Sequence, residues 1–107
     1  MKNITQFAFT VLLGFILFTT TVDAGSIKKG QKIYVQKIKD LCAGKSAGAF
    51  AATFTQIEWE NAFKVGKFET KVKKICPTMK SYNEQWTPYL FEFAYEYASD
   101  TGKEPAS

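Results

Sequence analysis

The sequence predicts an all-α fold, in which four helices form one small domain closed by a single disulfide bond. Three observations lead to this fold class. Apolar residues recur at intervals of three and four, which is the spacing along one face of a helix. Capping residues, glycines and prolines stand at the ends of these segments. Two cysteines lie in a domain that is expected to be exported, where an even number of cysteines favours a disulfide.

The N-terminal segment, residues 1–24, has the organisation of a signal peptide. Lys2 supplies a short basic start, and an apolar run of about 12 residues follows from Phe7 to Phe18, which is short for a membrane span. Val22 and Ala24 are small residues at the two positions that signal peptidase reads. We therefore expect cleavage after Ala24 and a periplasmic domain of residues 25–107 with no stable membrane span. An uncleaved N-terminal anchor is the alternative.

Composition narrows the function classes. The chain contains no histidine and no arginine. Histidine is the commonest general base near neutral pH and the commonest metal ligand, so Ser-His-Asp and Cys-His catalysis are excluded and no metal site is expected. Arginine is the preferred contact for phosphate and guanine, so nucleic-acid binding is not expected. No carboxylate pair is arranged for catalysis either, and we expect no enzyme activity.

The two cysteines, Cys42 and Cys76, are predicted to form a structural disulfide. The bridge would close a loop of about 35 residues, for which the chain-entropy model gives roughly 3–4 kcal/mol. That is comparable to the whole stability expected of so small a domain. Redox-active cysteines usually lie two residues apart, with a lowered thiol pKa. A redox pair and free or intermolecular thiols remain the alternatives.

The first helix is expected from about Ile27 to Leu41. Ser26 is placed to cap its N-terminus, and Gly44 to end it. Its apolar stripe consists of Ile27, Gly30, Tyr34, Ile38, Leu41 and Cys42. The next segment, residues 43–54, is rich in alanine and glycine, and we interpret it as a loop with one helical turn near Phe50.

The second helix opens with a capping box, in which Thr55 and Glu58 each accept from the other's backbone amide. It is expected from Gln56 to about Val65, with Gly66 just beyond its end. The residues expected on its apolar face are Trp59, Ala62 and Phe63.

The third helix is expected from about Phe68 to Ile75, because its apolar residues keep the helical spacing and Pro77 forbids continuation. Cys76 then lies at its end. Residues 77–87 are interpreted as a connecting loop that contains Met79.

The last helix is expected from Pro88 to about Ser99. Its aromatic residues alternate, which by itself indicates a strand. Thr87 followed by a proline, however, is the combination found at a helix N-cap and first turn, and it favours a helix. The residues of the helical stripe are Leu90, Phe93, Ala94 and Tyr97.

The charge is divided unevenly along the chain. Residues 25–80 carry a net charge of +8, and residues 81–107 carry −4. In the basic part, Lys64, Lys67, Lys71 and Lys74 follow one another at steps of three and four. We interpret these four lysines as a face that docks an acidic partner; a solvated surface without a partner is the alternative.

Two stretches of the chain resemble the ends of class I cytochromes c. Gly30, Ile33 and Tyr34 match the pattern Gly-x-x-Ile/Leu-Phe/Tyr that opens the family's first helix. The aromatic segment 89–97 is similar to its last helix, which packs across the first. Met79 lies roughly where the family keeps its axial methionine. The resemblance implies a cytochrome c-like helical domain in the bacterial periplasm.

The chain departs from that family at the haem-attachment motif Cys-x-x-Cys-His. Aligned on Gly30, the two thioether cysteines fall at Ile38 and Leu41, and the axial histidine falls at Cys42. His/Met ligation of a haem iron cannot form in a chain without histidine. We therefore expect no covalent haem c, and Met79 is only a vestigial candidate for cofactor binding.

A cytochrome-like helix set without haem needs other material at its centre, and the aromatic residues available are Phe50, Phe54, Trp59 and Phe63. The predicted function is that of a haem-less, exported, non-enzymatic protein that binds a redox partner or another acidic protein. The alternatives are an electron carrier that holds haem non-covalently through Met79 or a cysteine thiolate, and a small enzyme or inhibitor, for which no residue set is found.

Overall fold

A computed structural model describes residues 24–106 of the chain. The described residues are all-α: five α-helices with short π and 3-10 segments, and no β-strand among them. The predicted all-α class and the single disulfide are confirmed. The prediction of four helices was one too few, because the expected turn near Phe50 is a separate α-helix. Apart from Ala24, the predicted signal peptide lies outside the described residues.

The first helical rod is longer and less regular than predicted. Helix α2 is described over Ala24–Ile33, and a π-helical turn over Tyr34–Ile38 and a 3-10 turn over Lys39–Cys42 continue it. Ser26 had been predicted to cap the N-terminus of this helix. That prediction is wrong, because Ser26 lies inside α2. The buried residues recur every four positions along this rod, at Gly30, Tyr34, Ile38 and Cys42. Such a repeat drifts around a helix of 3.6 residues per turn, and the wider π turn offsets the drift.

The rod ends where it was predicted to end. Ala43 and Gly44 both adopt positive φ angles, 56° and 72°. The amide of Gly44 donates to the Lys39 carbonyl at 3.1 Å, which satisfies one of the carbonyls left open at the end of the helix.

Three short helices follow, and the first two begin at a residue whose side chain caps them. Helix α3, Ala47–Ala51, starts at Ser46, whose hydroxyl accepts the Ala49 amide at 3.2 Å. Helix α4, Gln56–Lys64, has the predicted capping box. Helix α5, Phe68–Ile75, has the predicted bounds, and Cys76 follows it directly.

The last helix, α6, spans Thr87–Glu96 and is preceded by a 3-10 turn over Glu84–Trp86. The helix prediction is confirmed, but the predicted N-cap at Thr87 is wrong. The Thr87 hydroxyl is hydrogen-bonded to the Tyr82 hydroxyl, 2.8 Å away, and the backbone is already helical before it. The helix also ends three residues before the predicted Ser99, whose amide donates to the Phe54 carbonyl at 3.0 Å.

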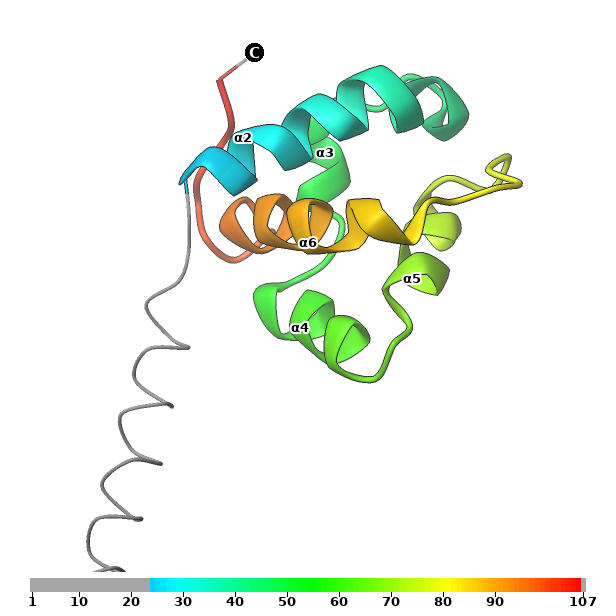
Figure 1. The fold of residues 1–107 in the computed structure, drawn as a ribbon. Helices are drawn as coiled ribbons and strands as arrows, with labels where there is room; N and C mark the ends of the chain where they lie inside the picture. The colour runs from blue at the N-terminus through cyan, green and yellow to red at the C-terminus, as the bar shows by residue number, and fades with distance from the viewer. Residues whose placement is uncertain (1–23, 107) are drawn as a thin grey trace, which may run out of the picture.

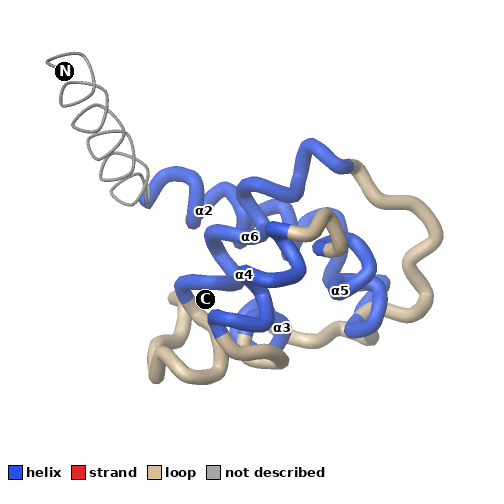
Figure 2. The backbone as a smooth tube through the Cα atoms, turned by 90° about the horizontal axis from the view of Figure 1, so that it is seen from below, coloured by secondary structure: helices blue, strands red, loops and turns tan. Residues whose placement is uncertain are grey.

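Helix α6 lies in the middle of the molecule, with α2 along one side of it and α4 along the other (Figure 1). The α2–α6 crossing is close because Gly30 of α2 has no side chain: a Cβ there would overlap the Tyr89 carbonyl oxygen and lie 2.9 Å from the Phe93 Cβ. In the view from below, α4 lies in front of α6, and α5 lies to one side (Figure 2).

The core is built largely from aromatic rings. Four of them, contributed by the first rod, α3, α4 and α5, follow one another with centroids 4.5, 5.5 and 5.3 Å apart: Tyr34, Phe50, Trp59 and Phe68. All are 2% exposed or less. Phe54 packs edge-on against Trp59 at 5.2 Å. Of the four aromatics that had been expected to fill the centre, Phe50 and Trp59 are in the buried core, Phe54 is partly buried against it, and Phe63 is exposed.

Candidate functional site

The candidate site is a groove of about 320 Å³ between α4 and α5, called here the docking groove. Gly66 makes the tight turn between the two helices with a φ of 74°, which a glycine adopts without strain. The Lys67 amide donates across this turn to the Ala62 carbonyl at 2.8 Å. The residues that line the groove are Glu58, Asn61, Ala62, Val65, Lys67, Thr70, Lys71 and Lys74.

Three of the four predicted lysines come together in this groove. Lys67, Lys71 and Lys74 lie at the start of and along α5 at steps of four and three, so they share one face of that helix. Lys64 is not part of the lining. It ends α4, and its ammonium lies 3.5 Å from the Glu60 carboxylate, one helical turn earlier. The basic face therefore consists of three lysines, and the fourth pairs within its own helix.

The groove lysines differ in their surroundings. The Lys71 ammonium lies 4.2 Å from the centre of the Phe54 ring, a cation–π contact with a residue outside the groove lining. In the described part of the chain, neither Lys67 nor Lys74 has a carboxylate within ion-pair distance. Lys73, by contrast, is paired with Glu69 at 2.8 Å and does not line the groove.

Glu58 is the one carboxylate among the residues that line the groove, and it is hydrogen-bonded to Thr55 in the capping box of α4. Its Oε1 accepts the Thr55 amide at 2.9 Å and the Thr55 hydroxyl at 3.2 Å. The backbone hydrogen bond, then the hydroxyl, and more weakly the nearby Lys71 ammonium lower the pKa of Glu58 below its ordinary value. The groove thus presents three lysines against one carboxylate that is already hydrogen-bonded within its own helix cap.

An exposed apolar strip, which the sequence reasoning missed, runs beside the lysines. Ile57 is 65% exposed and Val65 is 67% exposed. With Asn61 between them they occupy positions i, i+4 and i+8 of one face of α4 and its C-cap. The sequence carries no local signal for this strip, because the capping box sets where α4 begins and not which face it buries.

Phe63 had been predicted to lie on the buried face of α4. The structure contradicts this prediction. Phe63 is 38% exposed, and its ring stacks on Phe91 of α6 with centroids 4.3 Å apart and planes 10° apart. Trp59 is fully buried as predicted and donates its Nε1–H to the Ala51 carbonyl at 2.9 Å. Trp86 is half-buried and packs edge-on against Tyr82 at 5.4 Å.

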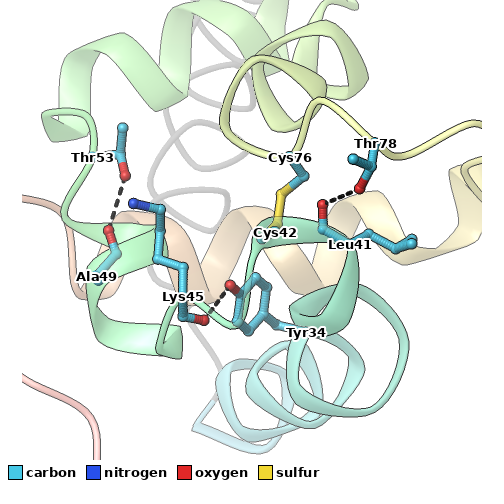
Figure 3. The surroundings of a disulfide bond; sticks show 8 residues. All are labelled: Tyr34, Leu41, Cys42, Lys45, Ala49, Thr53, Cys76 and Thr78. Carbon is cyan, nitrogen blue, oxygen red and sulfur yellow. Dashed lines mark hydrogen bonds between the residues drawn. A yellow bond between two sulfur atoms is a disulfide. The ribbon is translucent and has the colours of Figure 1, made fainter.

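The predicted disulfide joins Cys42 at the end of the first rod to Cys76 at the end of α5 (Figure 3). Both cysteines are buried, at 2% and 0% exposure. Beside the bridge, the Thr78 hydroxyl donates to the Leu41 carbonyl at 2.7 Å. Thiol–disulfide exchange needs access for an attacking thiolate, so this burial favours a structural bridge over a redox-active pair.

Met79 lies in the core and is 5% exposed, packed into the same cluster as Ile38 and Cys76. A haem iron of the cytochrome c type takes a histidine and a methionine as axial ligands. The chain has no histidine, and the sulfurs of Cys42 and Cys76 are bonded to each other, so Met79 is left without a second ligand. The residues around Met79 therefore do not fit the His/Met ligation of a cytochrome c haem, nor ligation by a cysteine thiolate.

The described residues contain no group of three His, Cys, Asp or Glu side chains that could hold a metal ion. Over residues 24–106, no helix has both the length and the apolar character needed to cross a membrane. Comparisons with protein-family models, with curated proteins and with solved structures gave no significant match.

Proposed function

We propose that this chain is an exported, non-enzymatic binding protein of cytochrome c-like ancestry that carries no covalent haem. It is cleaved after Ala24, acts in the periplasm, and docks an acidic protein partner in the groove between α4 and α5. The observation that carries the proposal is the lining of that groove, where Lys67, Lys71 and Lys74 face a single carboxylate.

The charges of the groove support an acidic partner. Opposite charge on a partner would steer it to this surface and bring ammonium groups close to carboxylates. Lys67 and Lys74 would not have to give up an existing ion pair in the described structure. Lys71 is held in place by Phe54, so it loses less side-chain freedom on binding.

The α2–α6 crossing supports the proposed ancestry. Gly30 belongs to the segment that resembles the first helix of class I cytochromes c, and Tyr89 is the first residue of the segment that resembles their last helix. These two residues meet where the helices cross, and Gly30 is small enough to permit the contact. The resemblance also implies a first helix and a last helix that pack across each other.

The bridge and the aromatic core support a haem-less domain. Tyr34, Phe50 and Trp59 place rings through the centre of the molecule, where van der Waals contacts stabilise it without a prosthetic group. The Cys42–Cys76 bridge requires an oxidising compartment, which accords with export.

An NMR titration of the disulfide-bonded protein with an oligoglutamate peptide tests the docking proposal. We expect saturable, salt-sensitive shifts of the amide signals of α5 and of the Gly66 turn, and no such shifts with oligolysine. The variant Lys67→Glu/Lys74→Glu should lose them. Absence of saturable binding, or shifts centred on another surface, would contradict the proposal.

A second measurement tests the proposed haem-less state and processing. The intact mass of the protein from its host should equal residues 25–107 less the two hydrogens of one disulfide, with no added haem. Titration with haem should give no saturable Soret band. An electron carrier with non-covalent haem, the alternative function, would give saturable binding that is lost in Met79→Leu.

A further inference from the structure

The docking groove is amphipathic as well as basic, and this indicates the form of the partner. We propose that it binds an acidic amphipathic helix, whose apolar edge lies on Ile57 and Val65 and whose carboxylates meet Lys67, Lys71 and Lys74. This inference rests on the proposed function and deepens it by naming the kind of segment that docks.

Two rows of side chains are exposed on the two helices of the groove. On α4, Val65 lies in the groove lining, while Ile57 is exposed two turns earlier and outside that lining. On α5, the lysine row runs from Lys67 to Lys74 within the lining. At 1.5 Å per residue, each row is roughly 11 Å long, or about two helical turns. A ligand that fits both must be apolar along one edge and acidic along the next, and a helix presents such edges when residues repeat at three and four.

The architecture favours a helix over an extended segment. An extended peptide binds best at the edge of a sheet, where its backbone amides and carbonyls find partners. The described residues contain no strand, and the groove walls are helices whose backbone groups already bond within the helix. A helical ligand satisfies its own backbone, so only its side chains need to match the groove.

A second copy of this chain is a poor occupant, because several of its own carboxylates are already engaged. Glu96 pairs with Lys103 at 3.1 Å, and Glu69 pairs with Lys73. Asp100 accepts the Gln56 amide at 3.0 Å. If these three carboxylates bound the groove lysines of another molecule, the ion pairs and the hydrogen bond within their own fold would be broken.

An anionic membrane surface is also a poor occupant. The groove is a hollow between two helices, and Glu58 lies in its lining. Glu60 and Glu69 stand on the same two helices and would be repelled by anionic headgroups. A protruding helix reaches into such a hollow, whereas a flat surface does not.

The experiment compares two fluorescent peptides of about 18 residues, long enough to form helices. Both have the same numbers of Glu, Leu and Ala. In one, the Leu and Glu residues form adjacent stripes at helical spacing, and in the other the order is scrambled. With the disulfide-bonded protein we expect the striped peptide to bind at least about tenfold more tightly by fluorescence anisotropy, a difference of about 1.4 kcal/mol.

Variants locate the binding on the two rows. Lys67→Glu/Lys74→Glu and Ile57→Ser/Val65→Ser should each weaken binding of the striped peptide by about tenfold or more. The matched controls are Lys37→Glu/Lys80→Glu and Val35→Ser, exposed residues outside the groove lining, and these should change it by less than about twofold. Circular dichroism confirms that each variant is folded.

The outcomes separate the two proposals. Equal binding of both peptides would overturn the helix inference while the basic docking face stands. Failure of both, together with failure of oligoglutamate, would overturn the docking face as well. Groove-dependent binding to phosphatidylglycerol vesicles without peptide preference, or a dimer that the lysine variant dissociates, would overturn the inference in favour of those occupants.

Discussion

Gly30 lies directly against the backbone of Tyr89 where α2 crosses α6. A Cβ built on Gly30 would overlap the Tyr89 carbonyl oxygen and lie 2.7 Å from the carbonyl carbon. Backbone atoms cannot move aside as the end of a flexible side chain can. The contact therefore fixes how closely the first and last helices of the domain approach.

The variant Gly30→Ala tests this contact. In an ordinary helix interior, replacing Gly by Ala stabilises by up to about 1 kcal/mol. Here we expect a loss of about 1–3 kcal/mol or more in the free energy of unfolding, because the added methyl forces the helices apart. Denaturant unfolding measures it, with Lys28→Ala on the exposed side of α2 as control. A gain in stability would contradict the close packing.

The disulfide is expected to supply a large share of the stability. Cys42→Ala/Cys76→Ala should lower the free energy of unfolding by about 3–4 kcal/mol, because the unfolded chain regains the freedom of a loop of about 35 residues, whose ends are 34 positions apart. Denaturant unfolding of the variant and of the oxidised protein gives the difference. A loss below about 1 kcal/mol would mean that core packing alone holds the fold.

Trp59 is predicted to be the most sensitive ring of the core. Trp59→Phe removes the hydrogen bond to the Ala51 carbonyl and leaves a cavity between Phe50 and Phe68, which together should cost about 2–4 kcal/mol. The control Trp86→Phe, at a half-buried site, should cost less than about 1 kcal/mol. Similar losses for both variants would contradict the central place of Trp59.

Glu58 should make the stability depend on acidity. Its folded-state pKa is lowered from 4.5, so its contribution is present above pH 4.5 and is lost as the pH falls through the folded-state value. Glu58→Gln keeps an acceptor for the cap but has no charge to lose. We expect the difference in melting temperature between the wild type and this variant to shrink as the pH is lowered below 4.5, and Glu60→Gln serves as a charge-matched control. A constant difference would contradict the assignment.

Two tyrosines should weaken the fold in alkali. Burial raises the pKa of Tyr34, and burial is the main cause that raises that of Tyr82, each from 10.0 to about 12. The stability from their neutral forms is complete below pH 10 and is lost as the pH rises through 12. Tyr34→Phe, which gives up the 2.5 Å hydrogen bond to the Lys45 carbonyl, should be less stable at pH 7, and the gap should narrow between pH 10 and 12. A gap that stays constant over this range would contradict the burial effect.

Elements with local chemical signals were predictable from the sequence. The Thr55–Glu58 capping box and Pro77 fixed the start of α4 and the end of α5, because each acts on its own neighbours along the chain. Thr87 misled because its hydroxyl found a partner in Tyr82, five residues earlier, and a 3-10 turn already preceded it. The continuation of the first helix past Ile33 and the burial of Tyr34 and Ile38 followed from the apolar stripe, but no local signal marked the π turn at Tyr34–Ile38.

The candidate site was predictable only in part. The spacing of Lys67, Lys71 and Lys74 predicted that they share one face of a helix. Lys64 instead ends α4 and forms an ion pair with Glu60, which depends on where α4 ends. The exposed Ile57 and Val65 were missed, since an apolar residue on a helix is expected to face the core. Only the packing of α4 against α6 decides that these two face outward.

The Cys42–Cys76 bridge encloses α3, α4 and α5, and with them both walls of the groove. A protease that cuts the exposed turn at Gly66 would leave two fragments that remain covalently joined, each still anchored to the α2–α6 pair. Such a nicked molecule would keep its two halves together at a very high local concentration. A cut in the exposed turn at Gly66 would thus leave the fold held together for as long as the two sulfurs stay bonded.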